Sequence, residues 1–183
     1  GRSSPYLGGG PELKVVDAMR YAEAELASGR LRADPLTESA LQATIGAVLL
    51  ANGDFERALP IAEAALRTRE RVEGGRDRDR LGVAVLVGRC EAALGRFDRA
   101  LPRLAAALAE EREFCPDSDV APGALFHLAS ALFRAGRAAE GLALAEENLA
   151  FESARVPPDP GALAGAEMLL SEGLLELGRT EAA

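Results

Sequence analysis

The stretch GDFERAL, at residues 53–59, decides the fold, because it returns as GRFDRAL at residues 95–101. Weaker copies are GRAAEGL at residues 136–142 and GRTEAA at residues 178–183. The four leading glycines are 42, 41 and 42 residues apart along the chain. A motif that returns at a near-constant period of this length indicates an array of helical repeats, in which each repeat is one supersecondary unit.

Each leading glycine stands between two apolar patterns of helical period. Apolar spacings of three, four and seven residues place these side chains on one face of each predicted helix. Glycine favours the left-handed cap at which the first helix ends and the chain reverses. In the first repeat the apolar residues are Leu41, Ile45, Val48 and Leu49 before the glycine, and Leu59, Ala62 and Leu66 after it. Seven residues before the glycines are the small residues Gly46, Gly88, Ala129 and Ser171, which let paired helices approach closely.

Helix starts are marked as well. Asp34-Pro35 and Asp159-Pro160 each place a capping carboxylate before a proline at the first helical position. We therefore expect an all-α chain of helix pairs. Residues 1–10 read as a linker or cloning remnant, and residues 11–183 as one repeat domain. Within it we predict a lead helix near 12–28, repeats near 35–73, 80–114 and 120–155, and a partial repeat at 160–183.

The composition argues against several classes of function. The net charge is −8, from 21 basic and 29 acidic residues, and Lys14 is the single lysine. Nucleic-acid binding needs a clustered basic surface, which this sequence lacks. No basic start followed by an apolar stretch marks a signal peptide, and no apolar run approaches the roughly 20 residues that span a bilayer. Cys90 and Cys115 form no disulfide framework, which favours a reducing compartment, and we predict a cytoplasmic location. We also predict no membrane contact.

Candidate chemistry is sparse. His127 is the single histidine, so a site with several histidine ligands and the usual Ser–His pairing within one chain are both excluded. Cys90 and Cys115 lack a Cys-x-x-Cys spacing, and the glycines at 8–10 are not followed by the Lys-Ser/Thr of a phosphate loop. We predict no enzyme activity, no cofactor and no metal site.

The repeated motif resembles the tetratricopeptide repeat, in which a small residue, a turn with glycine and an aromatic residue, and an Ala-Leu step recur. The period near 42 is similar to the variant of kinesin light chains and of many bacterial signalling proteins. Asp34 to Leu41, after a lead helix, also resembles the region that follows the catalytic domain of some bacterial Ser/Thr protein kinases. The resemblance implies a right-handed superhelical solenoid of antiparallel helix pairs. It also implies a concave groove lined by the first helix of each pair.

The motif positions that face this groove in the family fall on a mixed set of side chains. Phe126, Phe133 and Met168 either anchor a ligand or pack between neighbouring helices, and His127 is a solvent-side or groove residue. The candidate partner-binding residues are Arg89, Phe126, His127, Ser130, Phe133, Arg134, Met168, Glu172 and Glu176. Such a mixture suits a peptide or an amphipathic helix.

We therefore predict a protein-interaction scaffold, a module of a larger bacterial signalling or regulatory protein. Two alternatives stay open. One is a homo-oligomerisation element, with a homodimer formed through the C-terminal end. There Met168, Leu169, Leu170, Leu174 and Leu175 leave an apolar face open. The other is a regulatory domain that senses a small ligand in the groove.

Overall fold

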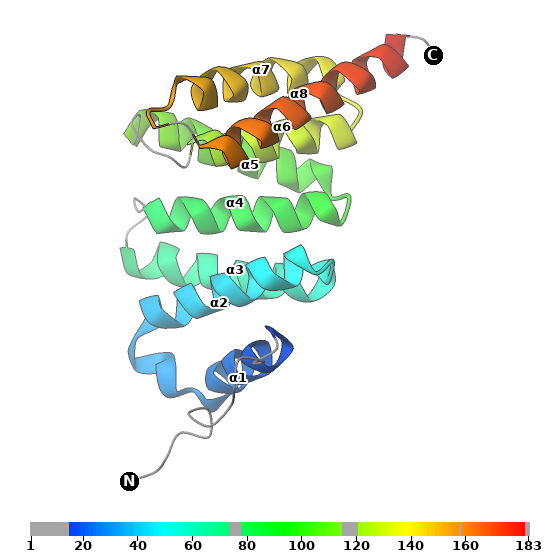
Figure 1. Ribbon diagram of the computed structural model, residues 1–183. Coiled ribbons are helices and arrows are strands. Elements are labelled where there is room, and N and C mark those ends of the chain that lie inside the picture. Colours follow the sequence, from blue (N-terminus) through cyan, green and yellow to red (C-terminus); the bar gives the residue numbers. More distant parts are fainter. Residues whose placement is uncertain (1–14, 74–77, 115–120, 158, 182–183) are drawn as a thin grey trace.

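The described part of the chain consists of helices joined by short turns (Figure 1). A computed structural model describes residues 15–73, 78–114, 121–157 and 159–181. The expected linker at residues 1–10 lies outside these ranges, as do residues 12–14 of the expected lead helix. The elements are α1 (Val15–Ser28), the 3-10 helix η1 (Arg30–Ala33), α2 (Pro35–Ala51), α3 (Phe55–Glu73), α4 (Arg78–Ala93), α5 (Phe97–Phe114), α6 (Ala121–Arg134), α7 (Ala138–Ala154) and α8 (Pro160–Glu181). The expected all-α class is confirmed.

Three glycines reverse the chain within the pairs α2–α3, α4–α5 and α6–α7. Gly53, Gly95 and Gly136 have φ angles of 79°, 72° and 76°, in the left-handed region that side chains disfavour. The next residue donates its N–H to the carbonyl five residues earlier. In the first turn the Asp54 N–H reaches the Leu49 carbonyl oxygen at 3.0 Å. The other two turns repeat this bond at 2.9 Å, and all three are Schellman caps.

Gly178 does not form the fourth turn that its place in the repeat suggests. It lies inside α8, which continues to Glu181, and its φ angle is not positive. A glycine permits a reversal without imposing one. At the other three turns a second helix packs back against the first, whereas no described residue beyond α8 does so.

The helices form a single stack in which each one contacts its neighbours along the chain (Figure 1). The first helices of the pairs also contact one another, α2 with α4, α4 with α6 and α6 with α8. Among the described residues the second helices α3, α5 and α7 make no such contacts with one another. The stack therefore curves toward its first helices, which line the inner side, while the second helices form the outer side.

Small residues allow the paired helices to approach closely. At Gly88 on α4 a β-carbon would lie 2.7 Å from Cγ of Leu104 on α5, so no larger residue fits there without a shift. Ala58 and Ala100, from the repeated Ala-Leu step, are completely buried. The central helix α4 is enclosed along most of its length, with Leu81, Val83, Ala84, Val85, Leu86, Val87, Gly88, Cys90, Glu91 and Ala92 all buried.

Candidate functional site

The candidate residues predicted from the sequence lie on three first helices that follow one another on the inner side of the stack. Arg89 belongs to α4, the residues from Phe126 to Arg134 belong to α6, and Met168, Glu172 and Glu176 belong to α8. Because α4 contacts α6 and α6 contacts α8, these helices form one continuous surface. We call this surface, together with the adjoining face of α2, the inner strip.

At its N-terminal end the inner strip is hollowed between α2 and α4. The hollow has a volume of about 500 Å³. Its walls are largely small side chains, since Ala40, Ala43 and Ala47 of α2 face Gly82 of α4. These residues are too short to fill the space between the two helices, and the hollow therefore stays open. The remaining lining residues are Thr44, Arg69, Arg78, Asp79, Val83, Leu86 and Arg89.

The charge in this hollow is positive although the whole chain is acidic. Arg69 is held by an ion pair to Asp79 at 3.1 Å and donates to the hydroxyl of Ser39 at 3.1 Å. Arg78 and Arg89 make no hydrogen bond or ion pair within the described part of the chain. Burial lowers the pKa of the Arg89 guanidinium, which is half-buried without an acidic neighbour. Two cations are thus left without a counter-charge.

His127 is a neutral residue of this surface. Burial, and secondly the positive charge of Arg89, lower its pKa from an ordinary value of 6.5 to about 3. Its ring meets that of Phe126 edge to face, with ring centroids 5.3 Å apart. Both side chains are half-buried. His127 therefore carries no charge at neutral pH and acts as part of an apolar patch beside Arg89.

Phe133 is not available as an anchor. It is only 4% exposed and belongs to a small core shared by α6, α7 and α8. Glycines on both other helices make room for its ring, because a β-carbon at Gly141 or Gly173 would lie 2.5 Å or 2.4 Å from ring atoms. Of the two possibilities left open by the sequence, Phe133 therefore packs between neighbouring helices. Of the two phenylalanines on α6, Phe126 is the one that remains partly accessible.

The other predicted residues lie at the surface. Ser130 and Glu176 are half-buried, whereas Arg134 and Glu172 are exposed. Arg134 reaches back to the preceding repeat, where it donates to the Ala93 carbonyl at 3.4 Å and lies 5.7 Å from the centre of the Phe97 ring. On α8 three large apolar side chains are exposed, namely Met168 (64%), Leu174 (55%) and Leu175 (65%).

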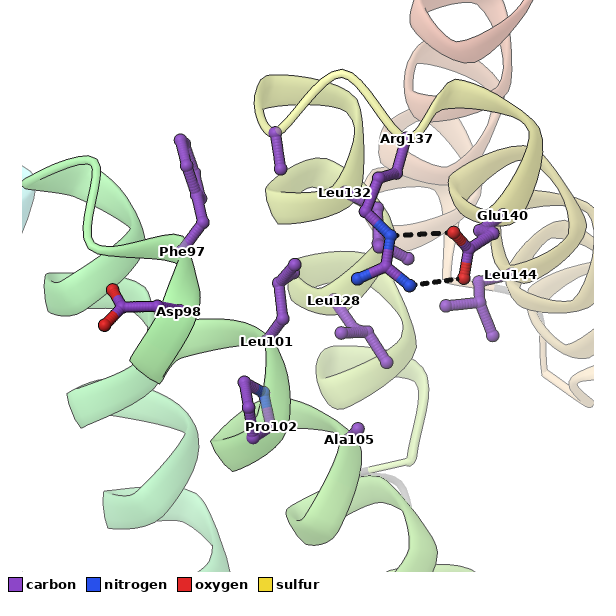
Figure 2. A pocket seen from close by; sticks show the side chains of 11 residues that line it. Phe97, Asp98, Leu101, Pro102, Ala105, Leu128, Leu132, Arg137, Glu140 and Leu144 are labelled. Atoms are coloured by element: carbon purple, nitrogen blue, oxygen red, sulfur yellow. Dashed lines mark hydrogen bonds and ion pairs between the residues drawn. The ribbon is translucent and has the colours of Figure 1, made fainter.

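A larger cavity, not predicted from the sequence, lies on the outer side of the stack. It has a volume of about 850 Å³ and runs between α5 and α7, with α6 as its floor (Figure 2). We call it the outer groove. Figure 2 shows the bidentate ion pair between Arg137 and Glu140 at its α7 edge, with N···O distances of 2.7 and 2.6 Å. The lining residues are Phe97, Asp98, Leu101, Pro102 and Ala105 on α5, Leu128 and Leu132 on α6, Ala135 and Arg137 in the turn after α6, and Glu140 and Leu144 on α7.

The equivalent space between α3 and α5 has a different chemistry. There Glu91, 1% exposed on the floor helix α4, receives two hydrogen bonds from Arg103 of α5 at 3.0 and 3.3 Å. Arg80 and Glu110 form a second ion pair in the same place. Glu91 lies four residues before the turn glycine of its repeat, and Arg103 lies eight residues after it. At the same two positions the next repeat has Leu132 and Leu144. That exchange of a charged pair for two leucines was the sequence signal for the outer groove.

Among the described residues no group of three His, Cys, Asp or Glu side chains is placed to hold a metal ion. Cys90 is completely buried, and burial raises the pKa of its thiol to about 11, which makes it unreactive. None of the helices in the described ranges is long and apolar enough to cross a membrane.

A stack of antiparallel helix pairs with glycine caps and a first-helix inner surface defines a helical repeat solenoid of the tetratricopeptide (TPR) type. In agreement with this class, residues 37–109, which cover α2 to α5, match the tetratricopeptide repeat family. Comparison with curated proteins gives no match.

Solved structures share the fold across most of the chain. Two are crystal structures of nearly identical TPR-like repeats from a kinesin-light-chain-like protein of Podospora anserina. One has a TM-score of 0.71 and 19% identity, covering 91% of this chain and 80% of that one. The other has a TM-score of 0.64 and 19% identity, covering 92% and 89%. A TPR-like protein of Chlorobium tepidum has a TM-score of 0.62 and 20% identity, covering 79% and 96%.

Proposed function

We propose that this chain is a protein-interaction scaffold that binds a peptide or helix of a partner protein along the inner strip. The observation that carries the proposal is the half-buried, unpaired guanidinium of Arg89 at the edge of an open hollow. A half-buried cation without a counter-charge is costly, and a carboxylate from a partner would offset that cost. Arg78, exposed in the same hollow, adds to the attraction.

The two ends of the strip differ in charge, which supports a defined direction for the bound segment. The α4 end carries Arg78 and Arg89, whereas the α8 end carries Glu172 and Glu176. Between them lie the apolar surfaces of Phe126 and Met168. An acidic stretch of the partner segment would lie against α4. The apolar and basic residues of the same segment would lie against α6 and α8.

The kind of protein in which this chain would function is proposed from the resemblance of its repeats. The period near 42 and the segment from Asp34 to Leu41 support a module of a larger bacterial signalling protein, such as the repeat region of a Ser/Thr kinase. The acidic composition supports a cytoplasmic location.

The test is selection of peptides from a random displayed library on the immobilised protein. We expect the selected peptides to be rich in Asp and Glu, with affinity measured by fluorescence anisotropy. Arg89→Gln should weaken binding at least tenfold, because it removes a charge-assisted hydrogen bond worth about 1.5–3 kcal/mol. Arg99→Gln, an exposed change on the outer helix α5, is the matched control and should leave the affinity unchanged. Equal loss in both variants, or selected peptides without acidic residues, contradicts the proposal.

Self-association through α8 is a second candidate, favoured by the exposure of Leu174. The residues at the same place in the earlier repeats, Leu49, Glu91 and Leu132, are buried beneath the second helix of their pair. On α8 this face is open, and a second copy could cover it. Sedimentation over a wide concentration range should then show a dimer that Leu174→Glu converts to monomer. A wild-type protein that is monomeric at high concentration removes this candidate.

A further inference from the structure

We propose that the outer groove is a second binding surface, which takes the apolar face of a basic amphipathic helix from a partner protein. It lies on the opposite side of α6 from the inner strip, so both surfaces could be occupied at once. The inference goes beyond the function proposed above and does not depend on it.

The outer groove is larger and less charged than the equivalent space between α3 and α5, with a volume of about 850 Å³ against about 560 Å³. Between α3 and α5 the long side chain of Arg103 extends from the wall to Glu91 on the floor. Between α5 and α7 the same two places hold Leu144 and Leu132, which cannot form such a bridge. What distinguishes this groove is an exchange of two charged residues for leucines, which leaves an apolar surface uncovered.

The shape of the groove suits a helix. Its walls are the two helices α5 and α7, which do not contact each other along their described residues, and its floor is α6. Two of the lining residues are small, Ala105 on α5 and Ala135 in the turn after α6. They let the backbone of a third helix approach closely. A volume of about 850 Å³ can then receive several large aliphatic side chains from one face of that helix.

The charge of the walls selects the flanks of the partner helix. Arg112 pairs with Glu147 and Arg137 pairs with Glu140, so these four charges compensate one another. The remaining charged residue that lines the groove is Asp98, which is exposed and has no partner within the described residues. Its uncompensated carboxylate leaves the groove with a net negative charge. Lysine or arginine beside the apolar face of the incoming helix would complement this charge.

A second copy of this chain fits the groove poorly. Its exposed apolar ridge, Met168 and Leu174 on α8, is flanked by the exposed carboxylates of Glu167 and Glu172. These carboxylates would meet the negatively charged groove, and like charges at an interface oppose association. The occupant is therefore a different protein with a basic helix.

The test uses a labelled synthetic peptide that forms an amphipathic helix of leucine and lysine, with binding followed by fluorescence anisotropy. The double substitution Leu132→Glu with Leu144→Arg copies the ion pair of the preceding repeat and should narrow the groove and remove much of its apolar floor. It leaves the net charge of the chain unchanged, so any general attraction between an acidic protein and a basic peptide is preserved. We expect at least a tenfold loss of affinity in this variant.

Two further variants keep the test decisive. Ala105→Trp fills the groove from an exposed position, so it should also cost at least tenfold even if the buried double substitution does not fold. Arg89→Gln, on the inner strip, should leave peptide binding unchanged and so separates this surface from the proposed peptide site. A wild-type protein that does not bind the peptide, or equal binding by wild type and Ala105→Trp, would overturn the proposal.

Discussion

Replacement of Gly173 by alanine should destabilise the protein, although alanine is the better helix former. Gly173 lies in the interior of α8 and faces the ring of Phe133. Alanine in a helix interior gains about 0.5–1 kcal/mol over glycine. Here its β-carbon would lie 2.4 Å from Cζ and 2.9 Å from Cε1 of Phe133, and 3.2 Å from Cδ1 of Leu142. The ring cannot move away freely, because Gly141 confines it on the side of α7.

The magnitude follows from a comparison within the same helix. At Gly165, also in α8, the nearest atom to an added β-carbon is Cε2 of Phe126 at 3.9 Å, an ordinary contact. Gly165→Ala should therefore stabilise by the full helix gain of about 0.5–1 kcal/mol. Gly173→Ala has the same gain but also an overpacking cost of about 1–3 kcal/mol. Because the helix gain cancels, the difference between the two variants measures the strain alone.

The assay is urea unfolding of both variants and of the wild type, followed by circular dichroism. Phe133→Leu combined with Gly173→Ala should recover part of the loss, because the smaller side chain makes room for the new β-carbon. A double-mutant cycle isolates this coupling. If Gly173→Ala is as stable as Gly165→Ala, the ring of Phe133 is not confined between the two glycines. Phe133 would then be free to reach the surface.

Two other predictions concern charged and titratable groups. Arg103→Ala should destabilise by about 3 kcal/mol or more in urea unfolding, because it leaves the carboxylate of Glu91 buried without its partner. Glu91→Leu combined with Arg103→Leu, which copies the next repeat, should cost much less, and equal losses would contradict this account. The pKa of His127 is about 3 in the folded protein, so the residue takes up a proton near its ordinary pKa of 6.5 only in the unfolded chain. The free energy of unfolding should therefore fall as the pH drops from 6.5 toward 3, by up to about 1.4 kcal/mol per pH unit. The imidazole resonance in proton NMR should accordingly show no titration between pH 5 and 8, and a midpoint near 6.5 would show that the ring is solvated.

The helix pairs could be predicted because their signals are local and repeated. The glycine caps at Gly53, Gly95 and Gly136 depend on backbone freedom and on apolar residues within a few positions, all readable in one dimension. Gly178 has a similar sequence around it but lies within a helix. The local glycine signal therefore does not by itself decide whether the chain reverses.

The surfaces were harder to predict, because they depend on the size of neighbours from other repeats. Phe133 has a motif position that faces the groove in the family, yet Gly141 and Gly173 open a space that draws its ring inward. These two glycines lie 8 and 40 residues away in the sequence and look unremarkable there. The outer groove likewise needs a comparison between aligned repeats, in which Leu132 and Leu144 replace a charged pair. Arg89, in contrast, has a motif position that predicts an inner surface, and in the structure it lines the hollow between α2 and α4.

Because α4 is enclosed by its neighbours, local unfolding of the stack should begin elsewhere. Contacts run between neighbours along the chain, so folding needs few distant encounters, and stability is nearly a sum over adjacent units. The ends should fray first, with amide hydrogens of α8 exchanging quickly and those of α4 most slowly. Arg89, on α4, and the α6 floor of the outer groove both belong to the slowly opening centre. A partner would therefore meet a preorganised surface and lose little affinity to the ordering of its receptor.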